Sequence, residues 1–385
     1  TFEMVMNILP LFLSNVLGVK TNIIGVIEGV AEATASLLKV FSGWLSDKLG
    51  GRKWIAVVGY GLSAIVKPLF YFANTWGLIA GVRWIDRVGK GIRTAPRDAL
   101  IADSVDTETR GLAFGFQRAA DTAGAVFGII VAVVVIWLAQ RNTVALGAAT
   151  FRTVVLISLV PGALAVLSLA IGARDVPVKG EQKAPKFAFK ALGKPFVVFM
   201  VIMSVFDLGN SSDAFLILRA QERGLSVIGI LIMLAAFNLI YALLSTPAGS
   251  LSDRIGRRRM ITAGWLVYAV IYLGFGLAAR AWHIVALYIL YGFYYALAYS
   301  TAKAFIADLV PENVRGTAYG TYNAVLGILD FPASVIAGVL WQGIGAWEGF
   351  GPSAPFLFGA GTALLACLLM LLWMPRTNEV SQLVK

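Results

Sequence analysis

Twelve apolar runs, each close to the length of a bilayer-crossing helix, follow one another along this chain. A helix needs about 20 mostly apolar residues to cross the hydrocarbon core of a membrane. The runs occupy residues 2–18, 23–45, 54–73, 76–100, 111–139, 153–172, 195–218, 225–248, 260–279, 282–307, 316–342 and 354–374. The composition agrees, since 58% of the residues are hydrophobic and 14% are charged, against about a quarter in soluble domains. The sequence therefore predicts an all-α integral membrane protein with twelve transmembrane helices.

Few residues in the chain can support catalysis or metal binding. The single cysteine, Cys367, permits no internal disulfide, and the single histidine, His283, leaves zinc or iron sites short of ligands. The sequence has no G-x-x-x-x-G-K-[S/T] phosphate loop, which excludes a pump with its own ATP-driven motor. We expect no cofactor, no metal site and no enzyme activity. A membrane enzyme, a receptor and a non-transporting scaffold are alternatives for which the sequence offers no specific motif.

Basic residues are concentrated in the loops on one side of the predicted membrane. The loops after the even-numbered spans and the central segment include Arg52, Lys53, residues 257–259 and the lysines between 179 and 194, whereas the opposite loops carry fewer bases. The positive-inside rule places the first side and both termini in the cytoplasm. We therefore expect a multi-pass protein of the cytoplasmic (inner) membrane. The net charge of +11 then reports mainly topology, and we expect no nucleic-acid partner.

An internal repeat divides the chain into two halves. The segment GWLSDKLGGRK at residues 43–53 recurs as GSLSDRIGRRR at residues 249–259. The tripeptide IAD at residues 101–103, with Arg110-Gly111 further along, recurs at residues 306–308 with Arg315-Gly316 at the same distance. Duplicated halves of this kind mark many secondary transporters. The repeat predicts two pseudo-symmetric six-helix halves, residues 1–172 and 195–385, joined by a cytoplasmic linker at residues 173–194.

The repeated loop resembles the signature of the major facilitator superfamily. That signature, G-x-L-x-D-x-x-G-x-R-[K/R] between the second and third spans, fits residues 43–53 and 249–259 at every defined position. Gly115, Gly124 and Gly128 are spaced like the glycines of the drug/proton antiporter branch, although Ile129 stands where that branch has proline. The resemblance implies the twelve-helix superfamily fold of a bacterial type, a small-molecule substrate, and alternating access within a lipid bilayer. We also expect a monomer.

The resemblance also implies a gate. In the superfamily, charge networks at the cytoplasmic ends of the spans are thought to latch one transport state. The corresponding residues here are Asp47, Arg52, Asp103, Arg110, Asp253, Arg258, Asp308 and Arg315. The alternative interpretation is that these short basic loops only anchor the orientation of the protein in the membrane.

Charged residues inside the predicted spans point to a lined cavity. A charge at the centre of a lipid-exposed helix costs about 2.5–3.5 kcal/mol, so most of these residues must face water or one another. Arg83, Asp86, Arg87 and Lys90 share one face of the span at 76–100. Two acids one turn apart, Glu28 and Glu32, share a face with Lys39, and Arg118 can pair with Asp121.

The second half contributes tyrosines and fewer charges. Tyr288, Tyr291, Tyr295 and Tyr299 run along one face of the span at 282–307, with Lys303 just beyond. Because an interfacial belt would cluster at the helix ends, we interpret this stripe as a cavity lining. Asn323 and Asp330 share a face of the next span, and Asp207 lies near Asn210.

These residues predict a secondary active transporter, coupled to protons, for a small organic solute that is anionic or amphiphilic. The candidate substrate-binding residues are Arg83, Arg87, Lys90, Arg118, Tyr291, Tyr295, Tyr299, Lys303 and Asn323. The candidate proton-coupling residues are Glu28, Glu32, Asp86, Asp121, Asp207 and Asp330. Broad efflux of lipophilic cations and uncoupled or sodium-coupled transport are the alternatives, and static salt bridges between helices are the non-functional interpretation of the charges.

Overall fold

The computed structural model describes residues 2–49, 51–105, 110–141, 143–175, 192–311 and 314–374, and the structural statements below concern these residues. Within them every regular element is helical, and the β-structure is a single bridge between Ile344 and Trp347. Two compact units divide the chain. The first comprises residues 1–185 with 226–231, and the second comprises residues 186–225 with 232–385. The predicted linker lies largely outside the described residues.

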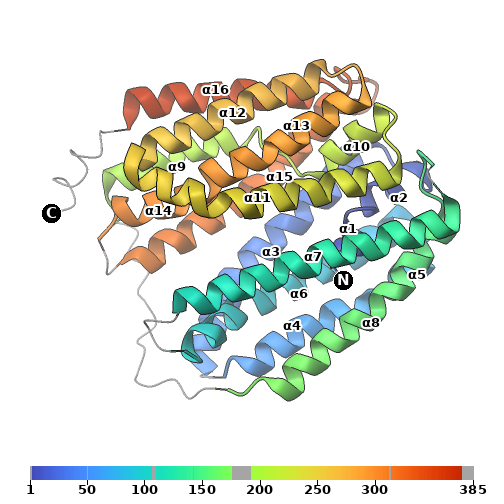
Figure 1. Cartoon of the computed structure of the whole chain (residues 1–385), viewed down its shortest axis with the longest axis horizontal. Coiled ribbons are helices and arrows are strands. Elements are labelled where there is room, and N and C mark those ends of the chain that lie inside the picture. The colour runs from blue at the N-terminus through green and yellow to red at the C-terminus, as the bar shows by residue number, and fades with distance from the viewer. Residues whose placement is uncertain are drawn as a thin grey trace. The chain divides into compact units, whose positions relative to one another are not determined.

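The first unit is built around one highly charged helix, α6. Its helices are α1 (Phe2–Met6), α2 (Leu9–Asn15), α3 (Thr21–Leu49), α4 (Lys53–Val66), α5 (Leu69–Phe72), α6 (Trp76–Asp103), α7 (Arg110–Gln140) and α8 (Ala148–Gly172). Helix α6 packs along both α3 and α4 (Figure 1). Small residues make this approach possible, because a Cβ at Gly91 would overlap Leu38 and Ala35 of α3. A Cβ at Gly89 would likewise overlap Ser63 and Gly59 of α4. Close packing of this kind is typical of membrane helices.

The second unit contains a break in its first span and a π-helical turn. Its helices are α9 (Gly193–Asp207), α10 (Ala214–Glu222), α11 (Val227–Ile255), α12 (Arg257–Leu277), α13 (Ala281–Tyr294), the π turn η2 (Tyr295–Tyr299), α14 (Ser300–Leu309), α15 (Arg315–Gln342) and α16 (Ala354–Trp373). Helix α12 packs against α16 and α13. The π turn falls in the middle of the predicted tyrosine stripe, and such turns occur frequently at functional sites.

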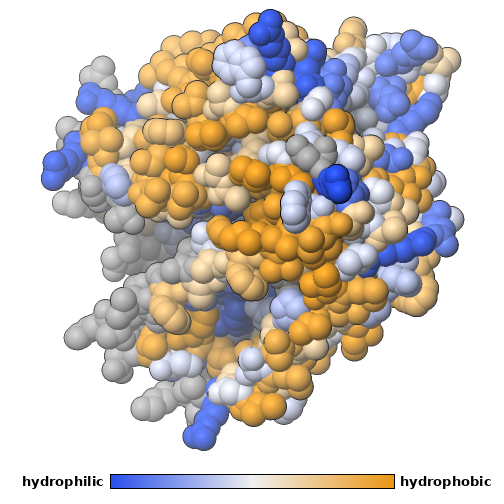
Figure 2. Space-filling view, turned by 45° about the vertical axis from the view of Figure 1, so that its right-hand side comes forward, coloured by the Kyte–Doolittle hydropathy of each residue, from blue (hydrophilic) through white to orange (hydrophobic). Residues whose placement is uncertain are grey.

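Eight helices in the described part of the chain are long and apolar enough to cross a membrane. Two more, α3 and α6, are 29 and 28 residues long but carry the charged residues discussed above. The spans expected at 2–18, 54–73 and 195–218 are each divided between two helices, which the apolar runs did not indicate. Large apolar side chains such as Phe116, Phe127 and Leu138 of α7 are exposed. Apolar surface covers much of the face in Figure 2, as contact with lipid requires.

Candidate functional site

Helix α6 presents its charged residues toward the inside of the first unit. The helix begins after Thr75, whose hydroxyl accepts a hydrogen bond from the Leu78 N–H at 3.4 Å. Arg83, Asp86 and Arg87 are all buried, whereas Trp84 on the opposite face is exposed. The helical period therefore separates a polar inner face from an apolar outer one, as the sequence pattern predicts.

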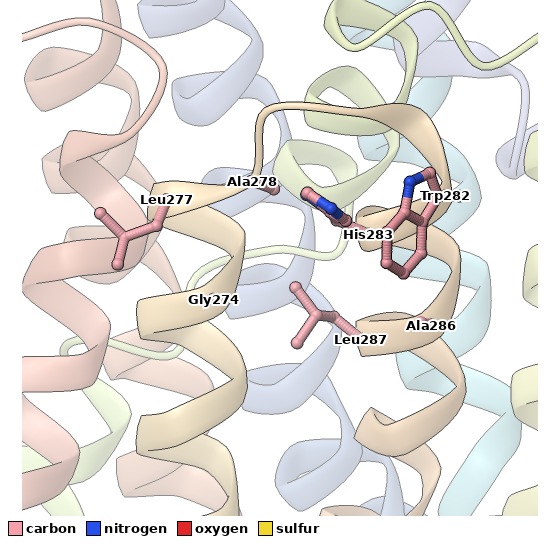
Figure 3. A pocket seen from close by; sticks show the side chains of 7 residues that line it. All are labelled: Gly274, Leu277, Ala278, Trp282, His283, Ala286 and Leu287. Atoms are coloured by element: carbon pink, nitrogen blue, oxygen red, sulfur yellow. The ribbon is translucent and has the colours of Figure 1, made fainter.

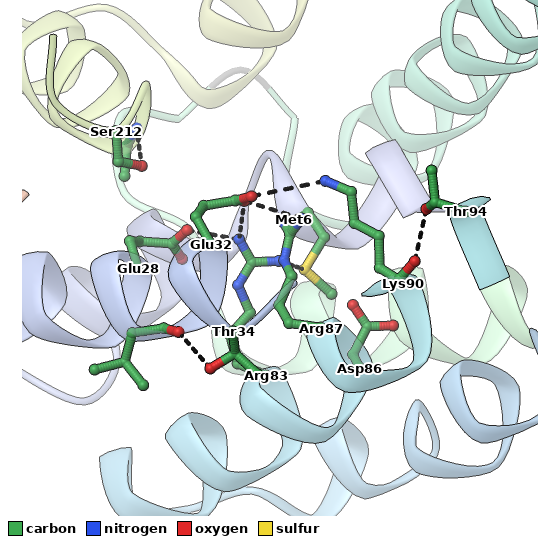
Figure 4. Close-up of polar contacts among 12 residues, drawn as sticks. Met6, Glu28, Glu32, Thr34, Arg83, Asp86, Arg87, Lys90, Thr94 and Ser212 are labelled. Carbon is green, nitrogen blue, oxygen red and sulfur yellow. Dashed lines mark hydrogen bonds and ion pairs between the residues drawn. The ribbon is translucent and has the colours of Figure 1, made fainter. Parts of the chain in front are cut away.

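Arg83 is held by an acid of α3. Its Nη2 lies 2.6 Å from Oε2 of Glu28, and both side chains are almost completely buried (Figure 4). Its Nη1 contacts Sδ of Met6 at 2.8 Å. A buried pair of this geometry is costly to break, because each remaining charge would be uncompensated. The arrangement favours a structural role for Glu28 over proton exchange.

Glu32 lies at the centre of a group of bases. Its carboxylate is 2.9 Å from Nη1 of Arg87, 3.7 Å from Nζ of Lys90 and 3.9 Å from Nη2 of Arg83. The charge of Lys39 acts on the same carboxylate. Arg87 is 3% exposed, but Glu32 and Lys90 are 30% and 32% exposed. The cluster therefore combines a buried base, Arg87, with a partly exposed acid and a partly exposed ammonium group; Figure 4 shows the three side chains together.

Asp86 is the buried acid of α6 itself. It is completely buried, and neither of its carboxylate oxygens accepts a hydrogen bond from a described residue. Asp86 interacts electrostatically with Lys67, which is buried at the end of α4, and with Arg93. In this part of the unit, the acids are Glu28, Glu32 and Asp86, and the bases include Lys39, Lys67, Arg83, Arg87 and Lys90. The described interior of the first unit thus carries an excess of positive charge.

Two of the predicted gate residues meet in the first unit. Nε of Arg52 lies 3.0 Å from Oδ2 of Asp103. Sequence reasoning missed Asp175, which follows α8 and accepts hydrogen bonds from the backbone N–H groups of Arg52 and Lys53 at 2.9 and 2.8 Å. A carboxylate at this position satisfies free donors at the start of α4 and complements the helix dipole.

The second unit uses a different arginine for the equivalent contact. The repeat aligns Arg52 with Arg258 and Asp103 with Asp308. In the structure, however, Asp308 pairs with Arg257 at 2.8 Å. Arg258 donates to the carbonyl groups of Met370 and Leu371 at the end of α16, at 2.9 and 3.0 Å.

Five of the predicted site residues have side chains outside the described part of the structure. They are Asp47, Arg110, Arg118, Asp253 and Arg315.

The tyrosine stripe is only partly available as a lining. Tyr288 and Tyr291 are fully buried in this structure. Tyr295 is half-buried and Tyr299 is 38% exposed. Nζ of Lys303 lies 5.4 Å from the ring centroid of Tyr299, in cation–π geometry.

Aromatic residues of α12 explain this burial. Tyr268 and Tyr272 stack with centroids 3.9 Å apart, and both contact the ring of Tyr291. The sequence pattern did not single them out, although they lie one turn apart on one helix face. The result is an aromatic core between α12 and α13, with Tyr295 and Tyr299 at its open end.

The remaining predicted residues make other contacts. Asp121 is exposed, lies 3.8 Å from Nη1 of Arg97, and accepts a hydrogen bond from Gln117 at 2.5 Å. Asn323 is exposed and donates to the Tyr319 carbonyl at 2.9 Å. Asp207 is buried where α9 ends, and the charge of Asp330 on α15 acts on it.

One arginine just beyond a predicted span is buried within a helix. Arg219 falls beyond the predicted span, yet the structure places it in α10 with its side chain completely buried. Its guanidinium donates to the carbonyl groups of Phe275 and Gly276 at 3.1 and 3.0 Å, and pairs with Glu222 at 2.6 Å. Arg219 thereby satisfies the free carbonyl groups at the end of α12.

A shallow apolar pocket lies between the neighbouring ends of α12 and α13 (Figure 3). Its volume is about 320 Å³, and it is lined by Gly274, Leu277, Ala278, Trp282, His283, Ala286 and Leu287. Nδ1 of His283 accepts a hydrogen bond from the Ala279 N–H at 3.4 Å. None of the predicted substrate or proton residues lines this pocket.

A family model described as Major Facilitator Superfamily matches residues 1–218 and, a second time, residues 197–385. This chain belongs to the major facilitator superfamily. The two matches agree with the internal repeat, and membership of the superfamily establishes a multi-pass membrane protein of the transporter class rather than an enzyme.

Known superfamily members resemble this chain along most of its length. An uncharacterised transporter of this type from Methanocaldococcus jannaschii is 36% identical over 376 residues, which cover 96% of this chain and 90% of the relative. A probable 4-methylmuconolactone transporter from Cupriavidus pinatubonensis is 25% identical over 348 residues, 84% of this chain and 77% of the relative. A solved variant of the nucleoside transporter NupG has the same fold, with a TM-score of 0.77 at 14% identity, covering 96% of this chain and 95% of that one.

Proposed function

We propose that this protein is a secondary active transporter that carries a small organic anion across the cytoplasmic membrane by alternating access, driven by the proton gradient. The observation that supports the anionic substrate is the group of bases around Glu32. A single carboxylate, open to one side, is surrounded by Arg83, Arg87 and Lys90 at 2.9–3.9 Å.

The role of Glu32 follows from this charge balance. Without a substrate, the carboxylate keeps the bases compensated, because like charges buried together repel one another strongly. An incoming carboxylate binds beside it and shares Lys90, which is the accessible base, while Arg87 holds Glu32 from behind. Charge-assisted hydrogen bonds of this kind are the strong ones. The substrate thus adds the negative charge that the site lacks.

A small organic substrate also agrees with a relative. The Cupriavidus pinatubonensis protein is named as a probable 4-methylmuconolactone transporter, which supports a small organic solute here. In the second unit, Tyr295, Tyr299 and Lys303 are the candidate residues for contact with an apolar or anionic group. The distribution of basic loop residues supports cytoplasmic termini, and a monomer is sufficient for this mechanism.

Uptake into proteoliposomes tests the proposal. Purified protein is reconstituted, a pH gradient is imposed, and entry of radiolabelled aromatic and aliphatic carboxylates is followed beside that of tetraphenylphosphonium, a lipophilic cation. We expect accumulation of at least one carboxylate that collapses when an ionophore abolishes the pH gradient. Accumulation that ignores the gradient would contradict proton coupling.

Efflux of lipophilic cations is the second candidate. It is supported by the partial glycine signature in α7 and by the acids of the second unit, which would attract cations. Arg87→Gln and Lys90→Gln distinguish the candidates, because a cation transporter gains from losing positive charge. Loss of carboxylate uptake in these variants supports our proposal. Efflux is supported if the unmodified protein takes up no carboxylate and the variants move the cation as fast as the unmodified protein or faster.

A further inference from the structure

The apolar pocket of the second unit lies between the neighbouring ends of two membrane-spanning helices. Its lining comes from the end of α12, residues 274–278, and from the first two turns of α13, residues 282–287. Arg257, which pairs with Asp308, stands at the opposite end of α12. The pocket therefore lies at the end of these helices that is away from the predicted gate, close to the surface of the membrane rather than at its middle.

The pocket opens on the lipid-facing surface of the same helices. Leu277 and Trp282 are exposed, and Figure 3 shows Leu277 and Leu287 on the two neighbouring helices. One turn further along, Leu273 of α12 and Leu290 of α13 are exposed as well. From Trp282 to Leu287 the helix rises about 7.5 Å. An apolar chain that enters at the helix ends can therefore continue along exposed apolar side chains toward the membrane interior.

The polar groups of the pocket are gathered at the helix ends. Nδ1 of His283 accepts a hydrogen bond from the Ala279 N–H at 3.4 Å, which leaves the ring proton on Nε2 as a donor. The indole of Trp282 lies edge-on to this imidazole, with ring centroids 4.1 Å apart, and its N–H is a second donor. Arg280 is exposed just before α13, and its side chain makes no hydrogen bond or ion pair with a described residue. Donors at the mouth and apolar side chains inside complement the head group and the chain of a lipid.

Further positive charge lies behind the pocket wall. Nη2 of Arg219 is 3.5 Å from the carbonyl oxygen of Ala278, which lines the pocket. Arg219 and Arg223 share one acid, since Glu222 lies 2.6 and 3.1 Å from their guanidinium groups. Together with the arginine at the mouth, these groups carry an excess of positive charge, which remains when Glu348 of the loop before α16 is counted. This end of the second unit therefore favours an anionic group.

We propose that this pocket binds one anionic phospholipid, with an acyl chain between α12 and α13 and the phosphate beside Arg280 and His283. Basic side chains at a membrane surface attract anionic lipids, and a tryptophan such as Trp282 is typical of the level of the head groups. The imidazole N–H can donate to a phosphate oxygen, in a hydrogen bond that the negative charge strengthens. None of these residues belongs to the proposed substrate cluster, and the lipid site does not depend on the proposed function.

Other occupants fit this pocket less well. A water-soluble organic anion needs polar partners for its charged groups, whereas the lining beyond the helix ends consists of Gly274, Leu277, Ala286 and Leu287. A helix of a second protein is about 10–12 Å across, which exceeds the room in a shallow pocket of about 320 Å³. An acyl chain is narrow and flexible enough to follow the pocket, and the surrounding membrane supplies it.

Thermal unfolding of the purified, delipidated protein in a non-ionic detergent tests the proposal. Phosphatidylglycerol should raise the unfolding temperature in a saturable way, because a ligand that binds only the folded state stabilises it. Phosphatidylcholine with the same acyl chains should need a concentration at least about fivefold higher for the same effect, since one basic residue near an anionic lipid contributes about this factor. Glycerol 3-phosphate, which has the phosphate without the chains, should have no effect. Equal effects of the two phospholipids, or an equal shift with glycerol 3-phosphate, would overturn the proposal.

Two variants with matched controls test the place of the lipid. Arg280→Gln should raise the phosphatidylglycerol concentration at half the effect about fivefold, whereas Lys20→Gln, which changes an exposed base before α3, should leave it unchanged. Ala286→Trp fills the pocket and should abolish the saturable shift. Leu290→Trp, one turn along the exposed face of α13 and outside the lining, should keep the shift.

Circular dichroism shows whether each variant is folded, and Arg280→Gln decides the question if Ala286→Trp does not fold. A saturable shift that survives in the folded Ala286→Trp protein would overturn the proposed place of the acyl chain, as would an equal loss in Leu290→Trp. An unchanged dependence on phosphatidylglycerol in Arg280→Gln would overturn the proposed contact with the phosphate.

Discussion

Arg87 and Glu32 form an ion pair at 2.9 Å in which the base is buried and the acid is open on one side. This asymmetry distinguishes the pair from Arg83 and Glu28, where both partners are buried at 2.6 Å. The two ion pairs lie one helical turn apart along α3 and α6. We interpret the inner pair as a strut between the helices and the outer pair as the start of the substrate site.

Lys90 is the residue whose loss should affect substrate binding most selectively. Its ammonium group is partly exposed and lies 3.7 Å from Glu32, so Lys90→Gln removes a base without leaving a buried acid alone. We expect KM for the transported anion to rise about tenfold or more, because a hydrogen bond to a charged group is worth about 1.5–3 kcal/mol. Initial uptake rates measure this, and Lys90→Arg should retain most of the affinity. An unchanged KM in Lys90→Gln would remove Lys90 from the site.

The Arg83–Glu28 pair should contribute to stability rather than to transport. Glu28→Gln removes the closest counter-ion of the buried Arg83 guanidinium and leaves Glu32 at 3.9 Å, which is expected to cost up to about 3–5 kcal/mol. Thermal unfolding in detergent measures the loss. The double variant Glu28→Leu with Arg83→Met removes both charges and should recover much of the stability. A Glu28→Gln protein as stable as the unmodified one would contradict the structural role.

Asp175 should stabilise the start of α4 through its two backbone hydrogen bonds. Asp175→Ala removes Oδ1, the one oxygen that accepts both hydrogen bonds, and loss of such a cap costs about 0.5–2 kcal/mol. Asp175→Asn keeps an acceptor oxygen and should cost clearly less. Thermal unfolding of the two variants side by side gives the comparison, and equal losses would show that the cap geometry does not matter.

Gly209 should tolerate no side chain. Gly209→Ala places a methyl group against Thr362 and Gly359, and overpacking of this kind typically costs about 1–3 kcal/mol. Gly361→Ala is the matched control on α16, since nothing lies within 4 Å of a Cβ there. We expect lower thermal stability and slower transport only for the Gly209 variant. The same behaviour in both variants would contradict a specific close approach at the break.

Periodic patterns predicted the charged face of α6 correctly, because Arg83, Asp86 and Arg87 repeat at helical spacing and a helix fixes their common face. The pairing of Arg87 with Glu32 could not be predicted in the same way, since it depends on how closely α3 approaches α6. The sequence shows that the chain is rich in glycine, but it does not show which glycines, such as Gly91, lie where two helices approach each other.

Other features were missed because tertiary contacts override local patterns. Tyr291 lies on a helical stripe but is covered by Tyr268 and Tyr272 of another helix. From the sequence, Arg219 is expected in a loop, but in the structure it is buried and donates hydrogen bonds to carbonyl groups at the end of α12. The break after Asp207 did have a signal, the polar run Asn210 to Asp213 within an apolar span, which also marks the segment where regular helix ends.

Proton-driven uptake of carboxylates by the reconstituted, unmodified protein is the measurement on which the proposed transport function depends most. We predict that at least one small carboxylate accumulates under a pH gradient, that it carries protons with it as a pH-sensitive dye on the far side reports, and that Lys90→Gln weakens its uptake. Movement of tetraphenylphosphonium with no carboxylate uptake under the same gradient would contradict proton-coupled transport of an organic anion.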